Sequence, residues 1–204
     1  MKHYIKFLLF FLIFISSNLS LFAQDSNNNL HDSLRKELET VYLADQQPRR
    51  SVNQIVKKYG FDSPQLDSLN RLIHQTDSLN LLKVQKIINT HGWLGKSEVG
   101  EIGNQTLLLI IQHSDLTVQE KYLPLLKKSV EKEESNGSDL ALFEDKILVS
   151  QGKKQLYGSQ VKRNPQTNQY ELYPIEDEKN VDKRRKKMGL EPLAEFLKGF
   201  GITY

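Results

Sequence analysis

Apolar side chains recur at helical spacing along most of this chain. From Leu30 to Tyr42 an apolar residue returns every three or four positions, which predicts a first helix that ends near Asp45. Pro48 is expected to stop this helix, because proline lacks the amide hydrogen that a helix needs. The pattern therefore predicts an amphipathic helix with one buried face.

The same spacing predicts a short helix over residues 51–59 and a further helical region up to His91. Ser63 followed by Pro64 is typical of a helix start, with serine as the N-cap and proline in the first turn. Two interpretations remain open beyond Pro64. Either one long bent helix reaches His91, or Asp77 caps a separate second segment.

Three further helices are predicted, with N-caps at Ser97, Thr117 and Ser138. The first of them, which runs through Ile111, is very apolar and is expected to be the central buried element. Gly152 is predicted to end the last of the three.

The pattern changes after these helices. Segments rich in Tyr, Val and Leu flank the turn sequence at residues 164–168, which predicts a β-hairpin near residues 153–175. Two short helices, about 181–187 and 192–199, are expected to close the chain. The predicted fold class is α+β, mostly α: a single helical domain over residues 30–204 with one β-hairpin.

The N-terminus predicts export. Two lysines in the first six residues precede an apolar run at 7–15, and Ala23 provides the small residue that a signal peptidase needs. Residues 1–23 are therefore predicted to be a signal peptide, followed by a flexible lead-in at 24–29. The apolar run is far below the roughly 20 residues that span a bilayer, so an uncleaved anchor is the less favoured alternative. We expect a periplasmic or secreted protein without a stable membrane anchor.

Charge argues against nucleic-acid binding. Removal of residues 1–23 leaves 26 basic against 25 acidic side chains, whereas a phosphate backbone is bound by a concentrated positive surface. The only dense basic run, residues 183–187, adjoins acidic residues and is interpreted as a solvated helix face. The chain has no cysteine, so it forms no disulfide.

Candidate chemistry is concentrated between residues 91 and 100, where the single Trp, one His and three Gly occur together. His91 and Trp93 can line a cavity, as a titratable group and a flat apolar wall. In the structural alternative, Gly92 ends a helix and Trp93 packs back on Ile88.

His113 and Asp115 follow the apolar central helix, where polar groups emerge from a buried element. We expect the ends of the helices, the hairpin and the corner after the first helix to meet in one polar pocket that binds a small polar ligand. Its predicted residues are His91, Trp93, His113, Asp115, Tyr157, Gln160, Asp45 and Arg49.

Whether such a pocket supports catalysis is left open. The enzyme alternative is a metal-independent acid–base hydrolase, with His113 as base, Asp115 or Asp45 orienting it, and His91 or Tyr157 as proton donor. The other alternative is an envelope interaction protein without a small-molecule site. A metal site of His91, His113 and Asp115 has only weak support from spacing, so no metal and no cofactor is predicted.

Gly95, Lys96 and Ser97 resemble a phosphate loop only superficially, because its first glycine would fall at Thr90 and no strand precedes it. A weaker hypothesis remains: the free amides at this helix start, beside Lys96, hold a small anion.

Several separated motifs together resemble domain-of-unknown-function family 6624. They are His91-Gly92-Trp93, Gly95, Ser97, Val99-Gly100, Gln112-His113, Asp115, Tyr157-Gly158-Ser159-Gln160, Pro174-Ile175, Val181-Asp182, Arg184-Arg185 and Gly189-Leu190. The resemblance spans most of residues 40–197 and implies a shared fold, with no known activity or cofactor. The family pattern has proline at Leu94, arginine at Lys146 and threonine at Ser159. The difference at Lys146 is the most consequential, because lysine cannot form the paired hydrogen bonds of an arginine guanidinium.

Overall fold

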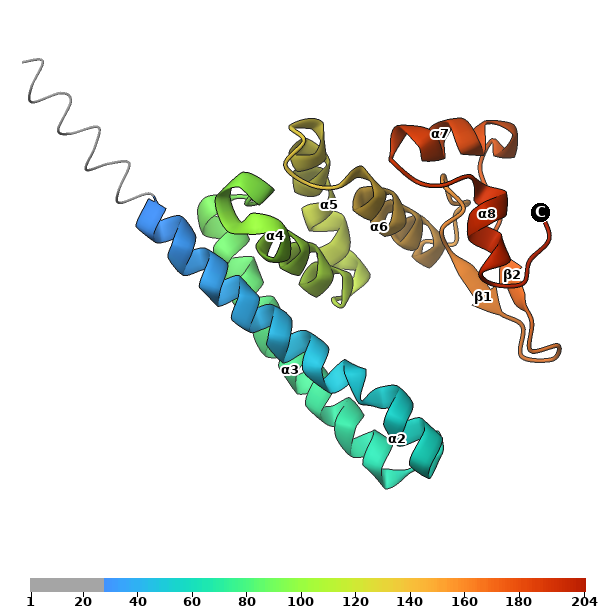
Figure 1. The fold of residues 1–204 in the computed structure, drawn as a ribbon, viewed down its shortest axis with the longest axis horizontal. Helices are drawn as coiled ribbons and strands as arrows, with labels where there is room; N and C mark the ends of the chain where they lie inside the picture. Colours follow the sequence, from blue (N-terminus) through green and yellow to red (C-terminus); the bar gives the residue numbers. More distant parts are fainter. Residues whose placement is uncertain (1–27) are drawn as a thin grey trace, which may run out of the picture.

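Two long antiparallel helices lie side by side along one edge of the structure, and shorter helices pack against them (Figure 1). The computed structural model describes residues 28–204. The predicted signal peptide and residues 24–27 lie outside the described residues, whereas residues 28 and 29 already belong to the first helix. After this N-terminal helix, residues 28–50, the elements are α2 (Val52–Tyr59), α3 (Pro64–His91), α4 (Lys96–Gln112), α5 (Leu116–Glu131), α6 (Gly137–Ser150), β1 (Val161–Arg163), β2 (Tyr170–Leu172), η1 (Glu178–Asn180), α7 (Val181–Lys187) and α8 (Leu193–Lys198).

The long helices begin and end where nearby residues predict, except at Pro48. Ser63 caps α3 through its side chain and Pro64 opens the helix, as predicted. α3 then runs unbroken to His91, so the long-helix interpretation is confirmed and Asp77 lies inside the helix. The prediction that Pro48 stops the N-terminal helix is wrong. Because Pro48 lies in the last turn, its missing amide hydrogen removes only one hydrogen bond there.

α4 is the central buried element, as its apolar sequence predicts. Leu107 and Ile111 have an exposed fraction of 0%. They join a core to which the neighbouring helices contribute Leu38, Val84, Tyr122 and Phe143. None of the described helices has both the length and the apolar character needed to cross a membrane.

The predicted caps of α4, α5 and α6 are wrong by two positions. The helices are preceded instead by Gly95, Asp115 and Asn136. At α5 the Asp115 carboxylate accepts a hydrogen bond from the amide of Val118 at 2.9 Å. A carboxylate is a favourable partner for the first amides because it is charged and the helix start is positive.

The hairpin is shorter than predicted, because only β1 and β2 pair. Their register matches Val161 with Leu172 and Arg163 with Tyr170. The preceding residues 155–160 do not continue β1. They curve around the buried carboxylate of Asp145, with a single bridge from Gln155 to Ile175.

Asp145 joins α6 to the C-terminal part of the chain. Its carboxylate is fully buried and accepts hydrogen bonds from the amides of Leu156, Tyr157 and Ser159, at 2.6, 3.0 and 3.0 Å. Arg185, 1% exposed, donates to the carbonyl of Tyr157 at 2.7 Å. The loop is therefore fixed from both sides by buried charged groups.

Replacing Asp145 by asparagine tests this connection. Asp145→Asn removes the charge and turns an amide group toward backbone donors, so we expect the free energy of unfolding to fall by about 2 to 4 kcal/mol. The same change at exposed Asp62 is the matched control, with an expected effect within about 0.5 kcal/mol. Urea denaturation measures both. Equal stabilities of the two variants would contradict this role of Asp145.

Candidate functional sites at the two ends of α4

The predicted site residues lie in three places: near the start of α4, near its end, and in the segment that contains Tyr157 and Gln160. His91 precedes the start of α4, and His113 follows its last residue. A helix of 17 residues is about 25 Å long before allowance for a bend. Gly100, with φ of 74°, bends α4 after its first turn, which shortens this distance somewhat. The expectation of one pocket containing both imidazoles is therefore wrong.

At the start of α4 the helix amides hold a carboxylate of the chain itself. Glu134 accepts hydrogen bonds from the amide of Ser97 at 2.9 Å and from its hydroxyl at 2.7 Å. These bonds hold the pKa of Glu134 below its ordinary value. The sequence suggests a small anion beside Lys96 at this helix start. The position is filled by Glu134, which the sequence places 37 residues after Ser97.

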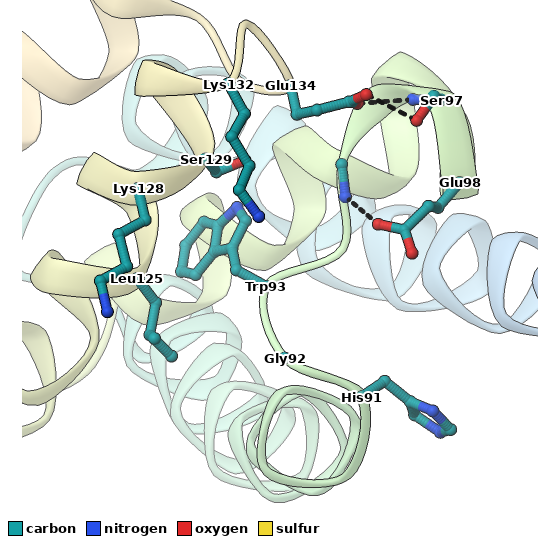
Figure 2. Close-up of a pocket in the computed structure, with 11 residues that line it drawn as sticks. His91, Gly92, Trp93, Ser97, Glu98, Leu125, Lys128, Ser129, Lys132 and Glu134 are labelled. Carbon is teal, nitrogen blue, oxygen red and sulfur yellow. Dashed lines mark hydrogen bonds between the residues drawn. The ribbon is translucent and has the colours of Figure 1, made fainter.

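A pocket of about 460 Å³ opens beside this helix start (Figure 2). We name it the Trp93 pocket, and its walls are His91, Gly92, Trp93, Gly95, Ser97, Glu98, Leu125, Lys128, Ser129, Lys132 and Glu134. Gly92, with φ of 81°, ends α3 and turns the chain so that Trp93 both packs against the core and lines the pocket. The structural and the functional interpretation of Trp93 are therefore compatible.

Some polar groups of the Trp93 pocket have hydrogen-bond or ion-pair partners, whereas others have none among the described residues. The indole Nε1 of Trp93 is shielded from solvent and has no hydrogen-bond acceptor among residues 28–204. Lys128 and Lys132 form no ion pair with any carboxylate in that part of the chain. In contrast, Glu98 accepts a hydrogen bond from the amide of Gly95 at 2.8 Å, and Glu134 is held by Ser97. The pocket has free donors and engaged acceptors.

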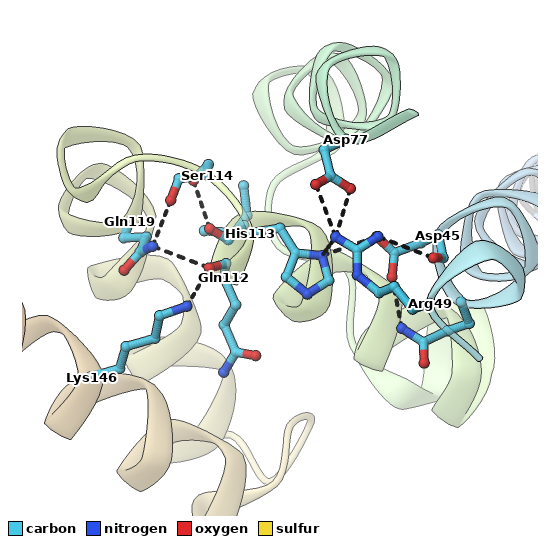
Figure 3. A network of polar contacts seen from close by, with 10 residues as sticks. Asp45, Arg49, Asp77, Gln112, His113, Ser114, Gln119 and Lys146 are labelled. Atoms are coloured by element: carbon cyan, nitrogen blue, oxygen red, sulfur yellow. Dashed lines mark hydrogen bonds and ion pairs between the residues drawn. The ribbon is translucent and has the colours of Figure 1, made fainter. Parts of the chain in front are cut away.

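A second polar site lies at the other end of α4 (Figure 3). We name it the Asp45 cluster: Asp45 and Arg49 from the N-terminal helix, Asp77 from α3, and His113 after α4. Arg49 Nη2 donates to both carboxylate oxygens of Asp77 at 2.8 and 2.9 Å. His113 Nδ1 lies 3.0 Å from Asp45 Oδ1 and also 3.0 Å from Arg49 Nη2. Three helices therefore meet at this site.

Asp45 is the buried centre of the cluster, with an exposed fraction of 0%. Burial acts to raise the pKa of its carboxyl, but hydrogen bonds from His113 and Gln46 and the charge of Arg49 outweigh it. The pKa of Asp45 is held below its ordinary value of 3.8. The cluster therefore contains an ionised carboxylate in the protein interior.

Lys146 reaches the same end of α4 from α6. Its amine donates to the backbone carbonyl of Gln112, and burial lowers the pKa of this amine. Gln119 also donates to that carbonyl at 3.2 Å. The ammonium group of Lys146 thus satisfies a carbonyl at the end of α4.

The remaining predicted residues belong to neither the Trp93 pocket nor the Asp45 cluster. Asp115 caps α5. Tyr157 donates to Glu144 at 3.3 Å, and burial together with the Glu144 charge raises the pKa of Tyr157 to about 12. Gln160 contacts Ser159 at 3.0 Å. Of the acid–base arrangement, the structure brings together His113 and Asp45, but not Asp115, His91 or Tyr157.

Sequence reasoning missed four important residues. The sequence presents Asp77 only as a candidate helix cap. It gives no indication of the role of Glu134, because the partner of Glu134 is distant in sequence. Lys128 and Lys132 are four residues apart, a spacing that places them on one helix face. That pair was the one detectable signal.

The molecule is thus a mostly helical α+β domain with a polar site at each end of its central helix. The chain belongs to the Family of unknown function (DUF6624), which it matches over residues 32–204. The matched segment contains both sites, and the resemblance seen in the sequence is confirmed. No curated protein and no solved structure matches the chain.

The lowered pKa of Asp45 predicts a specific pH dependence. Because the folded state holds this pKa below the unfolded value, the carboxylate stabilises the fold above about pH 4, and this contribution is lost as the pH falls through the folded pKa. In Asp45→Asn the free energy of unfolding should therefore depend less on pH between about pH 5 and 2. Urea denaturation across this range measures the slope. A slope equal to that of the wild type would contradict the assignment, and Asp62→Asn is the control.

Proposed function

We propose that this protein binds a small anionic organic ligand in the Trp93 pocket. The observation that carries the proposal is the buried indole N–H of Trp93, which has no acceptor among the described residues and lies in a pocket with two unpaired lysines. In Figure 2 the amine end of Lys132 points toward the nitrogen-bearing edge of the indole. An anion that displaces the Lys132 amine from this edge can accept hydrogen bonds from both groups.

The energetics favour an anion over a neutral ligand. A buried donor without an acceptor destabilises a protein by about 1 to 3 kcal/mol, and a bound acceptor recovers this energy. Lys128 and Lys132 repel each other because like charges four residues apart on a helix are unfavourable neighbours. A bound anion relieves this repulsion and receives charge-assisted hydrogen bonds.

The other walls indicate which anions fit. A pocket of about 460 Å³ lies in the range of small-molecule sites. The Trp93 ring offers an apolar surface, whereas the carboxylates of Glu98 and Glu134 can accept from hydroxyl groups. These features suit a hydroxylated organic acid or a sugar phosphate.

Trp93 provides the test, because it is the only Trp in the chain. Titration with inorganic phosphate, citrate and glucose 6-phosphate should change its fluorescence saturably for at least one of the organic anions. In Lys128→Gln/Lys132→Gln the dissociation constant should rise at least about tenfold, which corresponds to about 1.4 kcal/mol. Lys83→Gln, at an exposed position on α3, removes one similar charge elsewhere and should leave binding unchanged.

Two results would contradict the proposal. One is that no anion changes the fluorescence or releases heat on mixing. The other is that binding survives loss of both lysines. Either result would favour the alternative of an envelope interaction protein in which Trp93 only fills the core.

We also propose that the protein is exported to the periplasm or beyond the cell. The support is the sequence of residues 1–23, which lie outside the described part of the chain. N-terminal sequencing of the exported protein should begin at Gln24. An intact N-terminus on protein recovered from the cytoplasm would contradict export.

A further inference from the structure

We propose that Asp45, Asp77 and His113 form a binding site for a divalent transition-metal ion such as Zn²⁺, at the position that the Arg49 guanidinium takes in the Asp45 cluster. This site lies at the opposite end of α4 from the Trp93 pocket. The proposal is therefore independent of anion binding there.

The geometry of the donors comes first. One ligand atom from each of these residues lies within 4.8 Å of the others. Two atoms bound to one tetrahedral Zn²⁺ at about 2.1 Å are separated by about 3.4 Å. A contraction of up to about 1.4 Å, through rotation of the side chains, therefore brings all three onto one ion.

Arg49 shows that this point accepts a cation. Its Nη2 contacts both oxygens of Asp77 and lies 3.0 Å from His113 Nδ1. Its Nη1 lies 3.3 Å from Asp45 Oδ1. One guanidinium thus reaches all three donors, but its single positive charge faces two carboxylates. A divalent ion would neutralise both.

The contacts of His113 Nδ1 are mutually incompatible while Arg49 is present. This nitrogen carries at most one hydrogen. With the hydrogen, it donates to Asp45 but its N–H faces the Arg49 donor at 3.0 Å. Without the hydrogen, it accepts from Arg49 but its lone pair faces the Asp45 oxygen. A metal ion removes this conflict, because imidazole nitrogen and carboxylates then all donate lone pairs to the same cation.

Arg49 has a route out of the cluster. Its side chain is 23% exposed, and it lies in the last turn of the N-terminal helix, so it can turn toward solvent. His113 follows the C-terminal end of α4, whose partial negative charge also favours a cation. One nitrogen and two oxygen ligands suit Zn²⁺, Co²⁺ or Mn²⁺, and three protein ligands leave a coordination position open.

Metal titration of the whole protein tests the site. Calorimetry with Zn²⁺, and visible absorption with Co²⁺, should show one saturable site in the wild type. His113→Gln and Asp77→Asn should each weaken binding at least about tenfold, whereas Arg49→Met, which removes the competing cation, should tighten it by about tenfold or more. His31→Gln, at an imidazole of the N-terminal helix outside the cluster, is the matched control and should leave Zn²⁺ binding unchanged.

Wild-type affinity for Zn²⁺ in His113→Gln would overturn the proposal, and so would Arg49→Met that binds no more tightly than the wild type. Should Arg49→Met not fold, nitrogen NMR of the wild type decides the question. Saturating Zn²⁺ must then shift the Nδ1 resonance of His113, and an unchanged resonance overturns the site.

Discussion

Helix α4 is buried along most of its length, so the backbone groups at its ends must find partners within the protein rather than in water. At its start, Glu134 accepts from the amide of Ser97. At its end, Lys146 and Gln119 donate to the carbonyl of Gln112. The surrounding helices are arranged so that their polar side chains reach these two points. Glu134, Lys146 and Gln119 meet this requirement at the two ends of α4.

The two ends differ in the charge that they favour. The start of a helix attracts anions and its end attracts cations, within about one turn. The start of α4 accordingly holds a carboxylate and adjoins a pocket with free donors. The other end holds the amine of Lys146 and a cluster whose two carboxylates surround a guanidinium. A small anionic ligand and a metal ion would thus bind at opposite ends of one scaffold, far enough apart to act separately.

Local signals in the sequence predicted much of the fold. The order of helices, the central position of α4, the cap at Ser63 and the two short C-terminal helices are properties of near neighbours in the chain. The prediction failed where a distant residue decides the structure. Ser97 is not the cap of α4, because Gly95 takes that place and Ser97 serves Glu134. The hairpin is short because residues 155–160 bind the buried Asp145.

For the candidate site, too, the sequence indicates what near neighbours decide and not what distant residues decide. The sequence predicts site residues at Asp45, Arg49, His113 and Trp93, and each of them lies at or near a helix end in the structure. It could not indicate how these residues group in space, since grouping depends on the lengths and packing of α3 and α4. Asp77 joins the cluster only because α3 continues straight past it beside the N-terminal helix.

Anion binding in the Trp93 pocket is tested most directly by the indole N–H resonance of Trp93 in a two-dimensional nitrogen–proton NMR spectrum, recorded as an organic anion such as citrate or glucose 6-phosphate is added. Binding should give a saturable downfield shift of this single resonance, because a buried donor gains an acceptor. A resonance that stays in place at saturating concentrations of such anions would contradict it.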